Sequence, residues 1–337
     1  MKIAINGMGR IGRAFLKASL NYHELEIVAM NDLGDLPNIA YLLKYDSAYG
    51  QSGLNLSVEG DTLILNGAHI RFLQEKEPAN LPWKELGVDV VIESTGFFSD
   101  YNKANAHILA GAKRVIISAP AKDDPEGKIK GATVLVAENE ASLSGCKISS
   151  NGSCTTNAAG PVVSIMEQTL GVERALLNTV HAYTATQKLV DGPDSKDWRR
   201  GRAAAHNIIP SSTGAAVAVT QVATQLIGKF DGIALRVPVI SGSVADVTFV
   251  AKRDTNAEEV NDIMKKASLD PRWQGVFAIS DEELVSSDIV GRSEASIADL
   301  SMTRVVGNLV KVLAWYDNEC GYANTLVRHV LATKKYL

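Results

Sequence analysis

The sequence predicts an α/β fold, with a doubly wound, mostly parallel sheet in the first half of the chain. The second half predicts an α+β domain with a mostly antiparallel sheet. In the first half, short continuous apolar runs alternate with helical patterns, as in parallel strands covered on both faces. After about residue 150 this regular alternation ends. The length of 337 residues accommodates two such domains.

The first half contains runs of branched apolar residues separated by segments with a helical rhythm. Strands joined by helices in right-handed crossovers form a doubly wound sheet. The expected strands are residues 2–6, 25–31, 89–93 and 114–118, and the expected helices are residues 10–21 and 101–109. Residues 54–72 predict antiparallel strands instead, because they contain the tight-turn dipeptide Asn66-Gly67.

The second half mixes longer helices with strands of alternating polarity. The expected helices are residues 153–170, 213–227, 256–267 and 319–334, and the expected strands are residues 175–181, 233–239, 243–250 and 309–316. Residues 191–202 are polar and basic and predict a loop. Together these segments favour a mostly antiparallel sheet backed by helices.

The composition is ordinary for a soluble globular protein, with 46% hydrophobic and 21% charged residues. A net charge of −4 gives no electrostatic reason to bind nucleic acid or an anionic membrane. Cys146, Cys154 and Cys320 have no zinc-ligand spacing, so we expect no metal site, and their low number fits a reducing cytoplasm. The sequence shows neither a signal peptide nor an apolar run of membrane-spanning length, so we expect a cytoplasmic protein.

The segment GMGRIG at residues 7–12 is a G-x-G-x-x-G motif between a predicted strand and a predicted helix. In that setting Gly7 permits a tight turn, Gly9 lets the backbone approach a pyrophosphate, and Gly12 lets the helix pack against the strand. The free N–H groups and the dipole at the start of the helix favour phosphate. The motif therefore predicts a Rossmann-type dinucleotide site.

Asp32 follows the second predicted strand, 20 residues after Gly12. A carboxylate at this point accepts hydrogen bonds from the adenosine ribose and repels a 2′-phosphate, so we expect NAD rather than NADP. The alternative is a surface aspartate that caps the following turn.

Cys154 lies in the segment SSNGSCTTN, at the predicted start of a helix. The helix dipole favours a thiolate there and lowers the thiol pKa, which suits a nucleophile. The alternative is an inert buried cysteine. His181 ends a predicted strand, and beside a thiolate it would stabilise the anion and accept a proton. The alternative is a structural histidine, which is the commoner case for a lone histidine, and the local pattern does not bring the two side chains together.

Ten sequence blocks occur in a fixed order between residue 2 and about residue 330. They are NGMGRIGR, NDL, ESTGFF, ISAPAK, SNGSCTTN, VHAYTATQ, SKDWRRGRAA, NIIPSSTGAA, ALRVPV and WYDNECGYAN. Together they resemble the phosphorylating glyceraldehyde-3-phosphate dehydrogenase family. We therefore expect an NAD-binding Rossmann domain at residues 1–153, joined by the C-terminal helix 319–337, and a catalytic domain at residues 154–318.

The resemblance implies a mechanism in which Cys154 attacks the aldehyde carbon of glyceraldehyde 3-phosphate. His181 would act as the base and as the partner of the thiolate. Hydride would pass from the hemithioacetal to NAD, and inorganic phosphate would then release 1,3-bisphosphoglycerate from the thioester. The backbone N–H of Cys154 would help to hold the developing oxyanion.

The same resemblance implies three groups of binding residues. The substrate phosphate would bind to Thr184 and Arg236, with Arg200 as a helper. The attacking phosphate would bind to Ser153, Thr155, Thr213 and Gly214. NAD would bind to Gly7, Gly9, Arg10, Ile11, Gly12, Asp32, Thr95, Ser118 and Asn318, with Asn318 on the nicotinamide carboxamide. Without the resemblance, Ser153 and Thr213 would be interpreted as helix caps, and Arg236 as part of an ion pair.

The chain also departs from the family pattern. The segment VISG at residues 239–242 replaces the usual Thr-Pro-Asn-Val just after Arg236, which bears on the geometry of the phosphate site. Cys320 stands where tryptophan is usual, two residues after Asn318. Smaller changes occur at Met8, Gly152 and Val217.

Two alternatives to this function remain at this point. One is another aldehyde dehydrogenase of the same fold: either erythrose-4-phosphate dehydrogenase, which the segment HAYT disfavours, or a non-phosphorylating enzyme, which would lack a second phosphate site. The other is an NAD-binding scaffold without turnover, which the presence of Cys154, His181 and Asn318 disfavours. In the family, the loop at residues 191–202 reaches toward a neighbouring subunit's cofactor, which implies a homotetramer, and the pathway would be glycolysis or gluconeogenesis.

Overall fold

The computed structural model describes residues 1–122 and 127–337, which divide into two compact units. Unit 1 comprises Met1–Val134, Asn139–Gly152 and Leu326–Leu337, and unit 2 comprises Leu135–Glu138 and Ser153–Thr325. One helix, α9 (Cys320–Thr333), begins in unit 2 and ends in unit 1. Within the described residues, no helix combines the length and the apolar character needed to cross a membrane.

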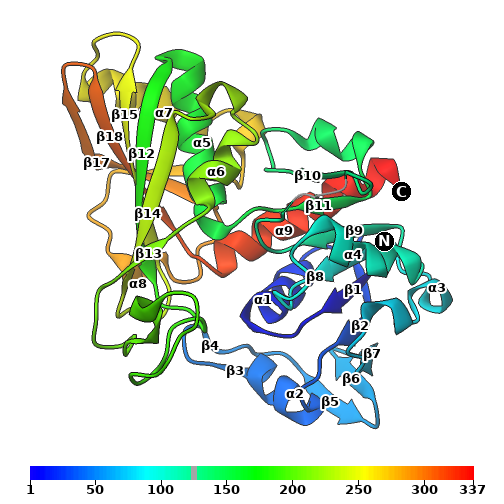
Figure 1. Cartoon of the computed structure of the whole chain (residues 1–337). Coiled ribbons are helices and arrows are strands. Elements are labelled where there is room, and N and C mark those ends of the chain that lie inside the picture. Colours follow the sequence, from blue (N-terminus) through cyan, green and yellow to red (C-terminus); the bar gives the residue numbers. More distant parts are fainter. Residues whose placement is uncertain (123–126) are drawn as a thin grey trace. The chain divides into compact units, whose positions relative to one another are not determined.

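Unit 1 contains a sheet whose described strands follow the order β10-β11-β9-β8-β1-β2-β7-β6-β5 (Figure 1). These strands are β1 (Lys2–Asn6), β2 (Glu26–Asn31), β5 (Leu56–Glu59), β6 (Thr62–Leu65), β7 (Ala68–Leu73), β8 (Val90–Glu93), β9 (Arg114–Ile117), β10 (Gly131–Thr133) and β11 (Ile148–Ser150). Strands β10 to β7 pair in parallel, whereas β7, β6 and β5 form an antiparallel meander. A separate ribbon pairs β3 (Tyr45–Asp46) with β4 (Gly50–Gln51). The doubly wound, mostly parallel sheet is therefore confirmed.

The strand order of unit 1 reverses at β1, which pairs with β2 on one side and β8 on the other. The carboxyl ends of β1 and β8 therefore form a topological switch point, where open α/β sheets bind ligands. The glycine-rich segment follows β1 directly and packs against the residues that follow β8. A Cβ atom added to Gly7 would lie 2.7 Å from the backbone nitrogen of Thr95.

The described helices of unit 1 lie between its strands. They are α1 (Arg10–Ser19), α2 (Leu36–Lys44), α3 (Trp83–Leu86) and α4 (Tyr101–Leu109). The sequence predicted α4 with its observed bounds and placed the end of α1 two residues too late. It missed α2, although Asp35 caps this helix and Pro37 lies in its first turn, which are both helix-start signals.

Unit 2 contains a mixed sheet with the order β13-β14-β12-β15-β18-β17-β16 (Figure 1). Its strands are β12 (Val172–Ala182), β13 (Ile209–Ser212), β14 (Phe230–Val237), β15 (Ser243–Ala251), β16 (Phe277–Ser280), β17 (Ser296–Val306) and β18 (Leu309–Tyr316). Strand β12 runs parallel to β14, and β16 runs parallel to β17, while the other neighbouring pairs are antiparallel. The predicted α+β domain with a mostly antiparallel sheet is confirmed.

The helix α5 (Cys154–Thr169) forms the centre of the unit 2 core. Its residues from Thr155 to Met166 are buried without interruption, so the helix is covered on all sides. Around it pack apolar side chains from the sheet and from neighbouring helices. The other described helices of the unit are α6 (Ala215–Thr220), α7 (Ala257–Ser268) and α8 (Ser286–Ile289).

Two predicted elements of unit 2 have the wrong bounds. The helix expected at residues 213–227 is only the six-residue α6, followed by a short 3₁₀ turn at Thr224–Leu226. Its β-branched residues, such as Val217 and Val219, have low helix propensity. The strand expected at residues 233–239 is β14, which ends at Val237 because Pro238 has no N–H to donate.

A buried polar network lies beneath the switch point of unit 1. The indole N–H of Trp83 donates to Nδ1 of His107 at 3.0 Å. In the neutral ring Nε2 then carries the proton, and it donates to a carboxylate oxygen of Glu93 at 3.0 Å. The amide of Asn6 donates to the same oxygen at 2.6 Å. Because these groups are buried, the carboxylate depends on its hydrogen-bond donors.

We predict that Trp83→Phe destabilises the protein by about 1–3 kcal/mol, because it leaves Nδ1 of His107 without its donor in a buried site. Calorimetric unfolding measures the effect. The matched control is Trp273→Phe, since Trp273 is also buried but its indole N–H has no hydrogen bond with the described residues. Equal destabilisation in both variants would show that ring packing, rather than the hydrogen bond, is responsible.

Candidate active site

Cys154 is the first residue of α5, at a helix start fixed by a reciprocal capping box. The Ser153 hydroxyl accepts from the backbone N–H of Thr156 at 3.0 Å, and the Thr156 hydroxyl accepts from the backbone N–H of Ser153 at 3.2 Å. Cys154 is a partly buried residue, and its thiol sulfur lies 3.3 Å from Nε2 of His181. The structure therefore brings together the two residues that the local sequence could not connect.

Strand pairing places Arg236 beside His181. These residues are register partners in the parallel strands β14 and β12. One terminal nitrogen of the Arg236 guanidinium lies 2.6 Å from Nδ1 of His181 and 3.2 Å from the carbonyl oxygen of Ala182. A guanidinium only donates, so Nδ1 accepts in this contact, but Nδ1 also lies 2.6 Å from the carbonyl oxygen of Ala182, to which it donates in the other neutral tautomer. In the tautomer that accepts from Arg236, Nε2 carries the proton and faces the Cys154 sulfur.

Burial and the adjacent charge keep this site neutral. Burial, followed by the charge of Arg236, lowers the pKa of His181 to about 3. Burial also raises the pKa of the Cys154 thiol, and the opposing effects of Arg236 and of hydrogen bonds from Thr155 do not cancel it. The expectation that the helix start lowers the thiol pKa is therefore wrong for this arrangement. Both shifts favour the neutral forms of the thiol and the imidazole.

Two arginines lie on or beside the neighbouring strands β13 and β14. Arg236 is in β14, next to His181, and Nε of Arg200 donates to the hydroxyl of Ser211 in β13 at 2.9 Å. The Nε atom of Arg236 is buried and has no hydrogen-bond partner among the described residues. Guanidinium groups suit the oxygens of a phosphate.

The other residues expected to bind phosphate all have local hydrogen bonds or lie at helix starts. Ser153 caps α5, and the Thr213 hydroxyl accepts from the backbone N–H of Ala215 at 3.2 Å, so both helix-cap interpretations describe real contacts. Hydroxyl contacts join Thr155 to Tyr316 at 2.8 Å and Thr184 to Thr186 at 2.9 Å. Gly214 is exposed at the start of α6, which has no side-chain cap at that residue. Their phosphate-binding roles stay predictions.

Asn318 is buried, and its amide oxygen is held by serine hydroxyls. Ser243 donates to this oxygen at 3.0 Å, and Ser241 lies at 3.4 Å. The amide nitrogen has no partner among the described residues, so it remains a donor for a ligand carbonyl. Ser241 belongs to the VISG segment at residues 239–242, and its shorter hydrogen bond goes to the Asp317 carboxylate, at 3.0 Å. The VISG segment therefore lies against the turn that carries Asn318, while Ser243 makes the closer contact with the Asn318 oxygen.

Cys320 follows Asn318 but has the properties of a packing residue. Its thiol contacts the carbonyl oxygen of Gly291 at 3.5 Å. Burial, with the nearby carboxylates of Asp317, Glu294 and Glu319, raises its pKa to about 11. A thiol that stays protonated at neutral pH is a poor nucleophile.

In unit 1, each glycine of the G-x-G-x-x-G segment has a distinct environment. Gly7 has a φ of +98°, which L side chains rarely adopt. A Cβ atom on Gly12 would lie 2.0 Å from the carbonyl oxygen of Gly7, so no side chain fits there. At Gly9, by contrast, a Cβ atom would meet no protein atom within 4 Å. This open space above an exposed backbone fits the close approach of a dinucleotide pyrophosphate.

Asp32 connects the glycine segment to the turn after β2. One carboxylate oxygen accepts from the backbone N–H of Met8 at 2.7 Å, and the other accepts from Gly34 at 2.8 Å. The turn-capping alternative is therefore observed as a contact. Each oxygen keeps a further lone pair, so the arrangement also fits the ribose role, which stays a prediction.

The remaining residues expected at the cofactor lie at strand ends or the start of α1. Ser118 follows β9, and its backbone N–H donates to the carbonyl oxygen of Glu93. The Thr95 hydroxyl and backbone N–H both donate to the carboxylate of Glu93. Arg10 is ion-paired with Asp46 at 2.8 Å, and Ile11 is partly buried in the first turn of α1. The sequence missed Glu93, whose signal was a carboxylate that ends an otherwise apolar strand.

Comparison with known proteins agrees with both halves of this description. Residues 1–101 match the domain described as "Glyceraldehyde 3-phosphate dehydrogenase, NAD binding domain", and residues 153–318 match "Glyceraldehyde 3-phosphate dehydrogenase, C-terminal domain". The chain belongs to the glyceraldehyde-3-phosphate dehydrogenase family. It is an NAD-dependent oxidoreductase, so the predicted family, enzyme class and cofactor are confirmed.

Relatives from distant organisms align along nearly the whole chain. Glyceraldehyde-3-phosphate dehydrogenase of Mycobacterium avium is 46% identical, over 100% of this chain and 99% of the relative. The Streptomyces coelicolor enzyme is 46% identical, over 97% and 96%. Glyceraldehyde-3-phosphate dehydrogenase 1 of Kluyveromyces lactis is 45% identical, over 98% and 99%.

The two glycine environments give a paired prediction. Gly9→Ala should fold with unchanged thermal stability but bind NAD roughly tenfold more weakly, because its methyl group enters the space expected for the pyrophosphate. Gly12→Ala should lose thermal stability, because its methyl group overlaps the Gly7 carbonyl. Calorimetric unfolding and NAD titration separate the two effects, and normal NAD binding by folded Gly9→Ala would contradict the assignment.

Proposed function

We propose that the chain catalyses the NAD-dependent oxidative phosphorylation of glyceraldehyde 3-phosphate to 1,3-bisphosphoglycerate. The observation that carries this proposal is the 3.3 Å contact between the Cys154 sulfur and Nε2 of His181, beside the guanidinium of Arg236. A nucleophile, a proton acceptor and an anion site within one unit are what an aldehyde bearing a phosphate requires. A protein that binds NAD without catalysing a reaction would need none of these contacts.

In the proposed reaction, Cys154 adds to the aldehyde carbon and its proton passes to His181. The backbone N–H groups at the start of α5 stabilise the oxyanion of the hemithioacetal. Bound NAD would supply the hydride acceptor. When the hydride leaves the oxyanion form of the hemithioacetal, a thioester forms on Cys154, and His181 releases to solvent the proton that it took from the thiol. Inorganic phosphate then attacks the thioester carbon, the Cys154 sulfur leaves, and the acyl phosphate is released.

Arg236 has a second role in this scheme, because it controls which nitrogen of His181 carries the proton. While it donates to Nδ1, Nε2 is protonated and cannot accept a proton from Cys154. The carbonyl oxygen of Ala182 lies 2.6 Å from Nδ1 and is a ready acceptor. When Arg236 turns to a substrate phosphate, Nδ1–H donates to Ala182 instead, and Nε2 becomes the base. Substrate binding thereby activates the nucleophile.

The site residues divide between the two units in the proposed assignment. Residues 1–153, with the C-terminal helix, form the NAD-binding domain, and residues 154–318 form the catalytic domain. Unit 1 carries the glycine segment, Asp32, Thr95 and Ser118 for the dinucleotide. Asn318 is assigned to the nicotinamide carboxamide, consistent with its unpartnered amide nitrogen.

We further propose a cytoplasmic homotetramer that acts in glycolysis or gluconeogenesis. Large apolar side chains of unit 2 support an assembled state, because Leu189 is 81% and Trp198 is 87% exposed. Trp198 belongs to the loop at residues 191–202, which we expect to contact a neighbouring subunit, and Leu189 lies just before this loop. Light scattering of the purified protein gives the subunit count.

The central test is NADH formation from glyceraldehyde 3-phosphate, with and without inorganic phosphate. We expect sustained turnover only when phosphate is present, and a lower kcat/KM with erythrose 4-phosphate. In Cys154→Ser, kcat should fall by at least about a thousandfold, because the nucleophile is lost, while NAD affinity is unchanged. Sustained turnover without phosphate, or an active Cys154→Ser variant, would overturn the proposal.

The role of His181 is tested separately. His181→Asn should lower kcat by about 10²–10⁴-fold, because it removes the proton acceptor. With inorganic phosphate present to engage Arg236, alkylation of Cys154 by iodoacetamide should be slower at pH 7 in this variant, and its pH profile should shift upward, because burial raises the thiol pKa and the group that accepts the thiol proton is gone. Both proteins carry Cys146→Ser and Cys320→Ser, so that Cys154 is the only thiol that can be alkylated. An unchanged pH profile of alkylation would exclude proton transfer from Cys154 to His181.

A further inference from the structure

A pocket of about 900 Å³ lies within unit 1, away from the glycine segment. Most of its lining residues lead into or begin the parallel strands β9, β10 and β11, and the rest come from α4 and from the C-terminal residues Tyr336 and Leu337. The pocket therefore opens at the amino edge of the sheet, whereas the glycine segment follows the carboxyl end of β1. Nothing in the proposed dehydrogenase reaction uses it.

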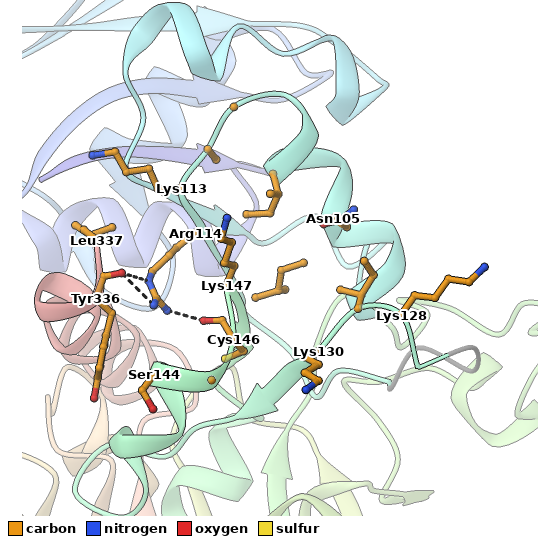
Figure 2. A pocket seen from close by; sticks show the side chains of 16 residues that line it. Asn105, Lys113, Arg114, Lys128, Lys130, Ser144, Cys146, Lys147, Tyr336 and Leu337 are labelled. Carbon is orange, nitrogen blue, oxygen red and sulfur yellow. Dashed lines mark hydrogen bonds between the residues drawn. The ribbon is translucent and has the colours of Figure 1, made fainter.

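The lining combines cations with an apolar wall (Figure 2). Five basic residues line the pocket, and no acidic side chain does so among the described residues. The basic residues are Lys113, Arg114, Lys128, Lys130 and Lys147, and the apolar wall includes Ile108, Ile129 and Ile148. This charge is local, because the whole chain has a net charge of −4.

Arg114 is a buried cation without an acidic partner. It is 6% exposed, and no carboxylate pairs with it among the described residues. Its guanidinium donates to the carbonyl oxygens of Cys146 at 2.9 Å, Leu143 at 3.1 Å and Tyr336 at 3.2 Å, as Figure 2 shows for Cys146 and Tyr336. Carbonyl dipoles hydrogen-bond the group but leave its charge uncompensated, and buried charges are normally paired. A positive potential therefore remains at the pocket.

Two lysines of the lining are available to a ligand. Lys113 is paired with Asp89 at 2.7 Å. Lys130 and Lys147, by contrast, are exposed and form no ion pair with the described residues. They precede β10 and β11, which are neighbours in the sheet, so both lie at the same edge. Flexible ammonium groups at the rim of a cationic pocket can each approach a different phosphate group.

We propose that this pocket binds a small molecule that carries a chain of phosphate groups. Lys130 and Lys147 contact the phosphate oxygens, and the charge of Arg114 beneath them compensates the anion. The isoleucines form a wall against which the organic part of a nucleotide can pack. The source of the phosphate chain is a nucleoside triphosphate or an inorganic polyphosphate, and both present the same chemistry to the lysines.

The test is isothermal titration of the full chain with ATP, inorganic tripolyphosphate and adenosine. Saturating NAD is present throughout, so that the dinucleotide site is filled. The test variant is Lys130→Gln, Lys147→Gln. The matched control is Lys265→Gln, Lys266→Gln, which also removes two positive charges, but from α7 in unit 2.

We expect saturable binding of a triphosphate probe to wild type and control, and at least about a tenfold loss of affinity in the test variant. The tighter of the two triphosphate probes identifies the source. Adenosine should bind at least about tenfold more weakly than ATP. Equal affinity of test variant and wild type, equal affinity for adenosine and ATP, or no saturable binding would overturn the proposal. Dehydrogenase activity should be unchanged in the test variant, so failure here leaves the proposed catalytic function intact.

Discussion

The contact between Cys154 and His181 depends on two backbone constraints within unit 2. The capping box fixes the start of α5 and, with it, the direction of the thiol. The parallel pairing of β12 with β14 fixes His181 at the end of its strand, with Arg236 as its neighbour. A shift of one residue in that pairing would reverse which face of the sheet each side chain occupies. The core around α5 is therefore part of the catalytic geometry.

In this arrangement, burial disfavours ionisation of both partners of the Cys154–His181 pair. The Arg236 guanidinium, 2.6 Å from Nδ1, lowers the pKa of His181 further. The same guanidinium opposes the effect of burial on the pKa of the Cys154 thiol. One charge thus acts in opposite directions on the two partners, and an anion bound to Arg236 would weaken both effects.

The sequence predicted the features that depend on local signals. The G-x-G-x-x-G turn, the start of α5 and the long strand β18 each have a motif, a cap or a continuous apolar run. The sequence did not predict the features that depend on tertiary contacts. The short strands β10, β11 and β13 have too few residues for a periodic pattern, and β17 was also missed. The thiol pKa was predicted in the wrong direction, because the helix dipole is visible in sequence whereas the burial of Cys154 is not.

In the parallel sheet of unit 1, the polar groups at the carboxyl edge and at the amino edge have different hydrogen-bond partners. At the carboxyl edge, the Glu93 carboxylate receives hydrogen bonds from Asn6, Thr95 and His107, so its lone pairs are largely satisfied. That edge supports a ligand through backbone shape, with open space at Gly9. At the amino edge, Arg114 donates only to neutral carbonyl oxygens, and Lys130 and Lys147 form no ion pair with the described residues. The carboxyl edge therefore favours a ligand that fits its backbone shape, whereas the amino edge favours an anion. The two edges differ in what they can bind, although both belong to the same parallel sheet.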